Sequence, residues 1–187
     1  GYGLRISIRK QVNQDLSTGL GIYYLDKDLD INDMGYLMRN DWFMIGGRTQ
    51  LQKTDFNKTS NTLVRTYQHS YGCRTLSNGD KEGCFSGFEI KNQFKNTSQI
   101  ETEVFFRTNG RDNLITRGSE LAPYIKLPQN YGIDFKYVGQ KNKFWQWDLF
   151  AQRSKGSEYS SDLGWRNKYY SSVKVFPLPN LTLRLSY

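Results

Sequence analysis

Hydrophobic and polar residues alternate along most of this chain, and the alternation is clearest from Gln99 to Thr108. Ile100, Val104 and Phe106 fall on one face of an extended strand there. Glu101, Glu103 and Arg107 fall on the other face, because successive side chains of a strand point to opposite sides. A strand of this kind separates two environments, and its apolar face is expected to meet either a protein core or lipid.

The same alternation, interrupted by clusters of turn residues, predicts about ten antiparallel strands. The expected strands span residues 1–9, 18–24, 42–53, 61–71, 85–94, 99–108, 124–133, 145–152 and 168–176, with a last one after residue 180. Short connections are expected at residues 12–15, 56–58, 95–98, 139–143 and 177–180, and long ones at 26–41, 73–84, 109–122 and 154–164. Pro128 lies inside the seventh strand and either weakens this strand assignment or indicates a bulge, because proline cannot donate to a strand ladder.

Short and long connections therefore alternate, which places all the short ones at one end of an up-and-down sheet. This asymmetry and the strand length of ~10 residues are typical of outer-membrane barrels, whereas a soluble β-sandwich has no reason to sort its loops in this way. Several charged residues are expected to face the interior of the barrel: Arg5, Arg9, Arg48, Arg65, Glu101, Glu103 and Arg107. A soluble barrel of this size fills its interior with apolar side chains, so these charges indicate a wet or plugged interior.

The fold prediction is thus an all-β, antiparallel, up-and-down transmembrane β-barrel. The composition agrees, since a mean hydropathy of −0.71 with 15% aromatic residues fits half-polar strands better than disorder. The chain of 187 residues is expected to form one barrel segment over residues 1–187, as a portion of a longer protein. The net charge of +8 is scattered along the chain, and we therefore expect no nucleic-acid partner.

Cys73 and Cys84 flank a loop that contains the turn dipeptide Asn78-Gly79. They are predicted to form a disulfide that hardens a surface loop, the alternative being two free thiols. No metal site is expected, because the acidic stretch from Asp26 to Asp33 lacks the glycine and the glutamate of an EF-hand. The single histidine, His69, has no Gly-x-Ser-x-Gly elbow to act with, and no catalytic residue or cofactor is predicted.

Two loop segments resemble those of a domain family of unknown function in Gram-negative bacteria. The segment from Asp30 to Asp41 is similar to the family pattern N-D-x-G-[FY]-x-x-R-N-[DN], and Thr116–Pro123 is similar to its R-G-G-x-x-x-x-P stretch, with Ser119 in place of the second glycine. In that family a family 9-like carbohydrate-binding module precedes a large outer-membrane barrel. The resemblance implies a set of extracellular-loop residues: Asn32, Asp33, Gly35, Arg39, Asn40, Arg117 and Gly118.

Taken together, the sequence predicts a protein of the bacterial outer membrane that is surrounded by lipid. Its expected role is that of a channel, or of a surface-recognition or structural component of a cell-envelope complex. Its long loops are expected to meet other envelope proteins or glycans. The alternative is a secreted or surface carbohydrate-binding protein associated with polysaccharide hydrolysis.

Overall fold

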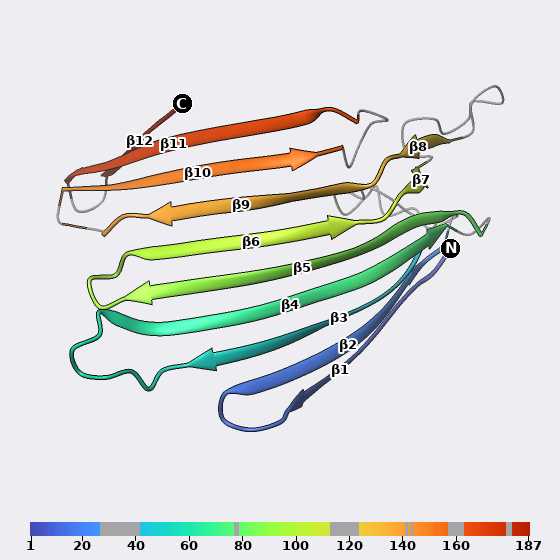
Figure 1. Cartoon of the computed structure of the whole chain (residues 1–187), viewed down its shortest axis with the longest axis horizontal. Helices are drawn as coiled ribbons and strands as arrows, with labels where there is room; N and C mark the ends of the chain where they lie inside the picture. Colours follow the sequence, from blue (N-terminus) through green and yellow to red (C-terminus); the bar gives the residue numbers. More distant parts are fainter. Residues whose placement is uncertain are drawn as a thin grey trace.

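The computed structural model consists of β-strands joined by turns and loops (Figure 1). It describes residues 1–26, 42–76, 79–112, 124–140, 142, 144–156, 163–178 and 181–187. Its strands are β1 (Gly3–Gln11), β2 (Leu16–Leu25), β3 (Trp42–Lys53), β4 (Thr62–Leu76), β5 (Lys81–Phe94), β6 (Gln99–Arg107), β7 (Gly110–Asp112), β8 (Ile125–Leu127), β9 (Asn130–Val138), β10 (Trp145–Lys155), β11 (Trp165–Leu178) and β12 (Leu181–Ser186).

Ten of these strands form one antiparallel sheet in the order β1-β2-β3-β4-β5-β6-β9-β10-β11-β12. Strands β7 and β8 form a separate two-stranded ribbon, so β6 pairs directly with β9. The predicted all-β antiparallel sheet of ten strands is therefore confirmed. The sheet is open, with β1 and β12 as its edges, so these residues do not form a closed barrel.

The connections differ from the prediction at β4 and β5. The stretch 73–84, expected to be a long loop, instead extends both strands to 15 and 14 residues, and residues 77–80 connect them. The connection from β3 to β4, residues 54–61, is longer than this one. The prediction of strictly alternating loop lengths was wrong here, because the polar residues on both sides of the turn continue the strand ladder as far as the pair Thr75–Lys81.

Pro128 lies between β8 and β9 and not within a strand. At this position no hydrogen bond of a strand ladder is lost, although proline has no N–H donor. The break it marks lets residues 125–127 leave the main sheet and pair with β7.

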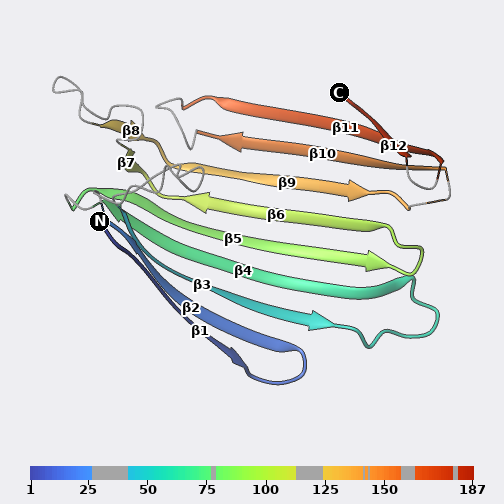
Figure 2. The same ribbon diagram turned by 180° about the vertical axis from the view of Figure 1, so that it is seen from behind.

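The sheet is a single curved layer, and the two opposite views show no second layer packed on it (Figures 1 and 2). Among the described residues, the buried hydrophobic side chains are Leu76 and Leu127. Leu76 is the last residue of β4, and Leu127 is the last residue of β8. The broad middle of the sheet therefore has no conventional hydrophobic core.

Within the described part of the chain, no helix has the length and apolar character needed to cross a membrane.

Candidate functional site

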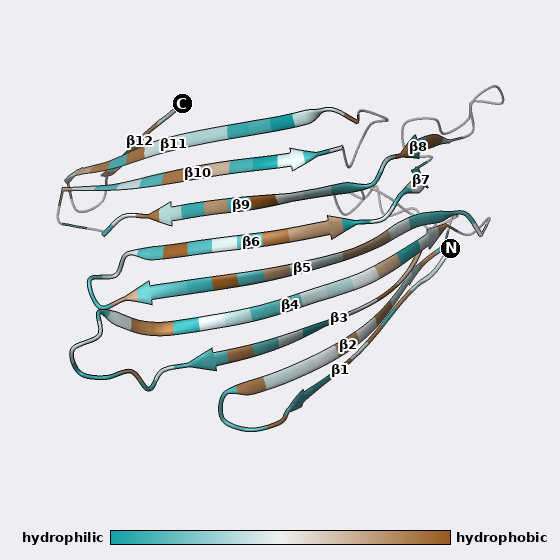
Figure 3. Cartoon of the chain, viewed as in Figure 1, coloured by the Kyte–Doolittle hydropathy of each residue, from teal (hydrophilic) through white to brown (hydrophobic). Residues whose placement is uncertain are grey.

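The main sheet has one polar and one apolar face. Residues that pair across neighbouring strands point to the same side, so the strand register assigns each side chain to a face. We call the face that carries Glu101 and Glu103 the polar face, and hydrophilic and hydrophobic residues alternate along the strands accordingly (Figure 3). Its charged and amide residues include Arg5, Arg9, Arg48, Gln50, Gln68, Arg74, Glu89, Lys91, Glu101, Glu103, Arg107, Asp134, Lys136, Asp148, Gln152, Arg166, Lys168, Lys174 and Arg184.

The opposite side, which carries Val104 and Phe106, is the apolar face. Large hydrophobic side chains are exposed across it from β1 to β12, including Ile8 at 70%, Val104 at 55% and Leu185 at 73%. Further exposed members are Leu4, Ile6, Leu20, Phe43, Ile45, Tyr71, Phe88, Tyr131, Ile133, Phe135, Leu149, Trp165, Tyr169, Val173 and Leu183. The apolar face is thus continuous over the whole sheet.

The polar face carries six of the seven charged residues that were predicted to face the interior. These six are Arg5, Arg9, Arg48, Glu101, Glu103 and Arg107. Arg65 does not, because it pairs with Lys53 on β3 and Asn92 on β5 and lies on the apolar face. Its Nε donates a hydrogen bond to the Asn92 side chain, and its guanidinium lies 5.7 Å from the centre of the Phe56 ring. These contacts, near the start of β4, accommodate the charge on the apolar face, which also carries Lys53, Arg153 and Lys155 near the ends of their strands.

Carboxylates form a row across the middle of the polar face. Glu89, Glu103 and Asp134 are direct cross-strand partners on β5, β6 and β9. Like charges directly opposite each other repel, so this row is stabilised where water or a ligand screens it or where one of its carboxyl groups is protonated. Among the described residues, no three His, Cys, Asp or Glu side chains are grouped so that they could hold a metal ion.

The next row along the sheet carries compensating charge. Glu101 lies between Lys91 and Lys136, and its Oε2 is 3.9 Å from the Nζ of each. The sequence prediction did not include Glu89, Lys91, Asp134 or Lys136. Their alternation with Ile90 and with Ile133 and Phe135 is the same signal that identified Glu101 and Glu103.

Paired charges also occur on the last strands of the polar face. The Nζ of Lys174 on β11 lies 3.5 Å from Oδ2 of Asp148 on β10. The same carboxylate oxygen accepts a hydrogen bond from the Ser172 hydroxyl at 3.2 Å. Lys174 and Asp148 therefore neutralise each other between two neighbouring strands.

His69 lies on the apolar face, where its Nε2 is 2.9 Å from the Ser86 hydroxyl and its ring contacts Tyr71. A catalytic Ser–His pair also needs a group that orients the imidazole and donors that stabilise an oxyanion. The contacts of His69 to described residues supply neither of these. The arrangement satisfies two polar side chains within an apolar surface.

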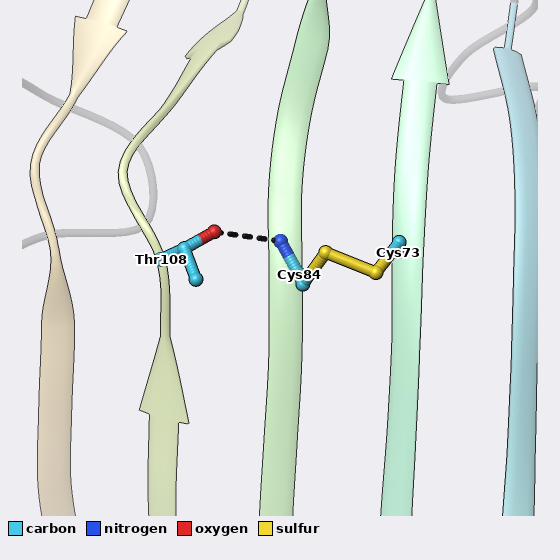
Figure 4. Close-up of a disulfide and its surroundings, with 3 residues drawn as sticks. All are labelled: Cys73, Cys84 and Thr108. Carbon is cyan, nitrogen blue, oxygen red and sulfur yellow. Dashed lines mark hydrogen bonds between the residues drawn. A yellow bond between two sulfur atoms is a disulfide. The ribbon is translucent and has the colours of Figure 1, made fainter.

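Cys73 and Cys84 are joined by a disulfide across β4 and β5 (Figure 4). The Cys84 carbonyl accepts a hydrogen bond from the Thr108 N–H, and its own N–H donates to the Thr108 hydroxyl. Because both backbone groups of Cys84 point away from β4, the two cysteines form a non-hydrogen-bonded pair, in which the side chains approach closely. The bond therefore lies within the strand ladder. The sequence had suggested a position in a surface loop instead.

Beyond the disulfide, the β4–β5 hairpin packs against the β7–β8 ribbon. Arg74 contacts Glu82 at 2.8 Å, and Arg111 contacts Asp80 at 2.9 Å. The Arg111 guanidinium also lies 4.4 Å from the centre of the Tyr124 ring. These contacts make the loop end of the sheet a small polar lobe with its own structure.

The predicted extracellular-loop residues all lie outside the described residues: Asn32, Asp33, Gly35, Arg39, Asn40, Arg117 and Gly118. Their spatial arrangement therefore stays a prediction.

No protein-family model, no curated protein and no solved structure matches this chain.

Proposed function

We propose that this chain forms part of the wall of an outer-membrane β-barrel whose polar face lines an aqueous passage. The resemblance of its loop segments to a barrel family of Gram-negative envelopes is consistent with this proposal. In this arrangement the apolar face meets lipid, and the edges β1 and β12 meet further strands that complete the wall.

The observation that carries the proposal is the continuous exposed apolar face. Ten strands at a spacing of ~4.8 Å make a face about 43 Å wide. With an apolar band about 25 Å tall, its area is on the order of 1,000 Å². Soluble monomers rarely expose apolar patches larger than a few hundred Å², so a surface of this size needs lipid or a large partner to cover it.

The charges on the two faces support lipid as the covering environment. The polar face carries the row of Glu89, Glu103 and Asp134, which needs water nearby. A protein partner would have to bury one face of a single-layer sheet while leaving the other hydrated. Lipid outside and water inside provide both environments for every strand at once.

Aromatic side chains at the strand ends add further support. On the apolar face, Tyr131 and Trp165 contact edge-to-face with ring centres 6.1 Å apart, at the loop end of the sheet. Trp145 lies at the opposite, turn end and is 43% exposed. Aromatic rings that border an apolar band at both ends are the usual arrangement at the two interfaces of a membrane barrel.

A matched pair of labels on β6 tests the proposal. Val104→Cys and Glu103→Cys place a fluorophore on opposite faces of the same strand, at nearly the same height. In vesicles that contain brominated lipid, we expect strong quenching of the label at 104 and weak quenching at 103, because only the first faces the acyl chains. The native cysteines are held in a disulfide and do not react under non-reducing conditions.

Equal quenching at the two positions would contradict a lipid-facing apolar side. Solubility of the full chain without detergent would also contradict it and would favour the secreted carbohydrate-binding alternative.

A further inference from the structure

The polar face is hollowed at the β1 edge of the sheet. The hollow has a volume of about 450 Å³ and is lined by residues of β1 to β5. Most of them lie on the polar face, and Ile8, Leu20 and Tyr71 of the apolar face also contribute to the lining. This volume falls within the ~300–1,000 Å³ typical of small-molecule sites. It is therefore large enough for a compact organic solute.

Three arginines line this hollow, namely Arg5, Arg9 and Arg48. None of the other described residues that line it is acidic. Glu89 of β5 interacts electrostatically with one of them, Arg48. The hollow is thus a concentration of positive charge next to the acidic row.

This imbalance distinguishes the hollow from the middle of the polar face. There the lysines have an acidic neighbour, since Lys91 and Lys136 flank Glu101, and on β11 Lys174 contacts Asp148. In the hollow, Arg5 lies over the Tyr23 ring, 5.1 Å from its centre, and Arg9 donates a hydrogen bond to the Ser17 hydroxyl at 3.5 Å. Since each guanidinium has five N–H donors, these contacts leave donors that can bind a ligand.

Two of the arginines lie on either side of a position that has no side chain. Arg9 and Arg48 belong to the same row of the sheet, separated by Gly19 on β2. Two strand spacings place their backbones about 10 Å apart, and glycine leaves the space between them without a side chain. Two guanidinium groups that lean across such a gap can each donate to one oxyanion, as guanidinium forks do with carboxylates and phosphates.

The remaining lining suits a hydroxyl-bearing ligand. Ser7, Ser17 and Gln50 offer groups that both donate and accept hydrogen bonds. The rings of Tyr23 and Phe85 give the hollow apolar surfaces on which the face of a sugar ring can pack. A bare inorganic anion would use the arginines and leave this lining unused.

We propose that the hollow binds a hydroxyl-bearing organic anion, such as a sugar phosphate or a uronic acid, with its oxyanion held between Arg9 and Arg48. This inference does not depend on lipid at the apolar face, because the hollow lies on the other side of the sheet.

Calorimetric titration of the full chain in detergent tests the assignment. The probes are glucose 6-phosphate, glucose and inorganic phosphate, at constant ionic strength. We expect glucose 6-phosphate to bind at least about tenfold more tightly than glucose, because a charge-assisted hydrogen bond accounts for such a ratio. We also expect it to bind more tightly than inorganic phosphate, which lacks the sugar ring.

Variants separate this site from general positive charge. Arg9→Gln and Arg48→Gln are each expected to weaken glucose 6-phosphate binding about tenfold or more. Arg166 lies on β11 in the same row of the sheet, six strands away from β3. Arg166→Gln is therefore expected to change the affinity for glucose 6-phosphate less than about twofold. Arg9 lies on the exposed edge strand β1, so Arg9→Gln is expected to fold. Its affinity for glucose 6-phosphate therefore tests the site even if Arg48→Gln does not fold.

Equal losses in Arg166→Gln and Arg9→Gln would overturn the proposal, since they would indicate a diffuse charge effect. Equal affinity for glucose and glucose 6-phosphate would overturn the role of the arginines, and equal affinity for inorganic phosphate would overturn an organic ligand. The absence of binding at millimolar concentrations would refute the site altogether.

Discussion

At the scale of single residues, glycines on the polar face permit a close approach of neighbouring strands. Gly21, Gly46 and Gly72 are consecutive members of one row on β2, β3 and β4. A Cβ at Gly46 would lie 2.8 Å from the backbone oxygen of Tyr71, which cannot move without shifting β4. A Cβ at Gly21 would meet the Tyr23 ring at 2.9 Å, and a side chain can rotate away.

Gly46→Ala is therefore expected to destabilise the protein more than Gly21→Ala does. Overpacking against a fixed backbone costs on the order of 1–3 kcal/mol, whereas movement of a ring costs less. Denaturant unfolding of the two variants in the same detergent measures the difference. A larger loss in Gly21→Ala would show that the Tyr23 ring is held more rigidly than the backbone of β4.

The disulfide makes a second prediction for single residues. The double variant Cys73→Ser/Cys84→Ser is expected to lose about 2–3 kcal/mol of unfolding free energy, because Cys73 and Cys84, separated by 11 positions, close a short loop in the unfolded chain. Unfolding with and without reductant checks it: reductant should destabilise the native protein by a similar amount and leave the double variant unchanged. The prediction would be contradicted if reductant left the unfolding free energy of the native protein unchanged and the double variant were as stable as the native protein.

At the scale of secondary structure, β6 shows how one strand serves two environments. Glu101 and Glu103 lie in the charged rows of the polar face, while Val104 and Phe106 are exposed on the apolar face. The alternation was readable from sequence because β6 is unbroken over nine residues. The same reasoning failed for Arg65. This residue was assigned to the polar face because of its charge, although it alternates in phase with Tyr67, His69 and Tyr71 of β4, which lie on the apolar face.

Arginine placed on the two faces of β6 is expected to have unequal effects on stability. Val104→Arg would place a charge among lipid chains and is expected to cost about 2–4 kcal/mol if the position is near the bilayer centre. Glu103→Arg introduces the same side chain between Glu89 and Asp134, where it relieves repulsion, so its stability should be unchanged or higher. Unfolding titrations in lipid vesicles measure both, and equal costs would argue against a lipid-facing side.

At the scale of the whole molecule, the charges of the polar face form zones. The hollow at the β1 edge is basic, the middle strands carry the row of Glu89, Glu103 and Asp134, and β10 and β11 carry the Lys174–Asp148 pair. A solute that moves along this wall would meet both signs of charge. In a passage of this kind, charged side chains determine which ions cross.

Neutralising the acidic row is expected to change ion selectivity. In the barrel proposed above, Glu89→Gln/Glu103→Gln should shift the reversal potential in planar bilayers toward anion permeation, because it removes negative charge from the polar face. Arg65→Gln is the matched control, since this charge lies on the apolar face and should leave the reversal potential unchanged. A shift caused by Arg65→Gln alone, or the absence of conductance, would contradict the assignment of the polar face to the passage.

The sequence alone determined the strand class, the approximate strand number and the two-faced character of the strands, because these follow from period-two alternation within each strand. Only the tertiary structure decided what depends on pairing between strands. Register assembled Glu89, Glu103 and Asp134 into one row, brought Arg9 and Arg48 to either side of Gly19, and moved Arg65 to the apolar face. These relations join segments far apart in the chain, and a shift of one residue in pairing would have reversed every face, so local sequence patterns could not determine them.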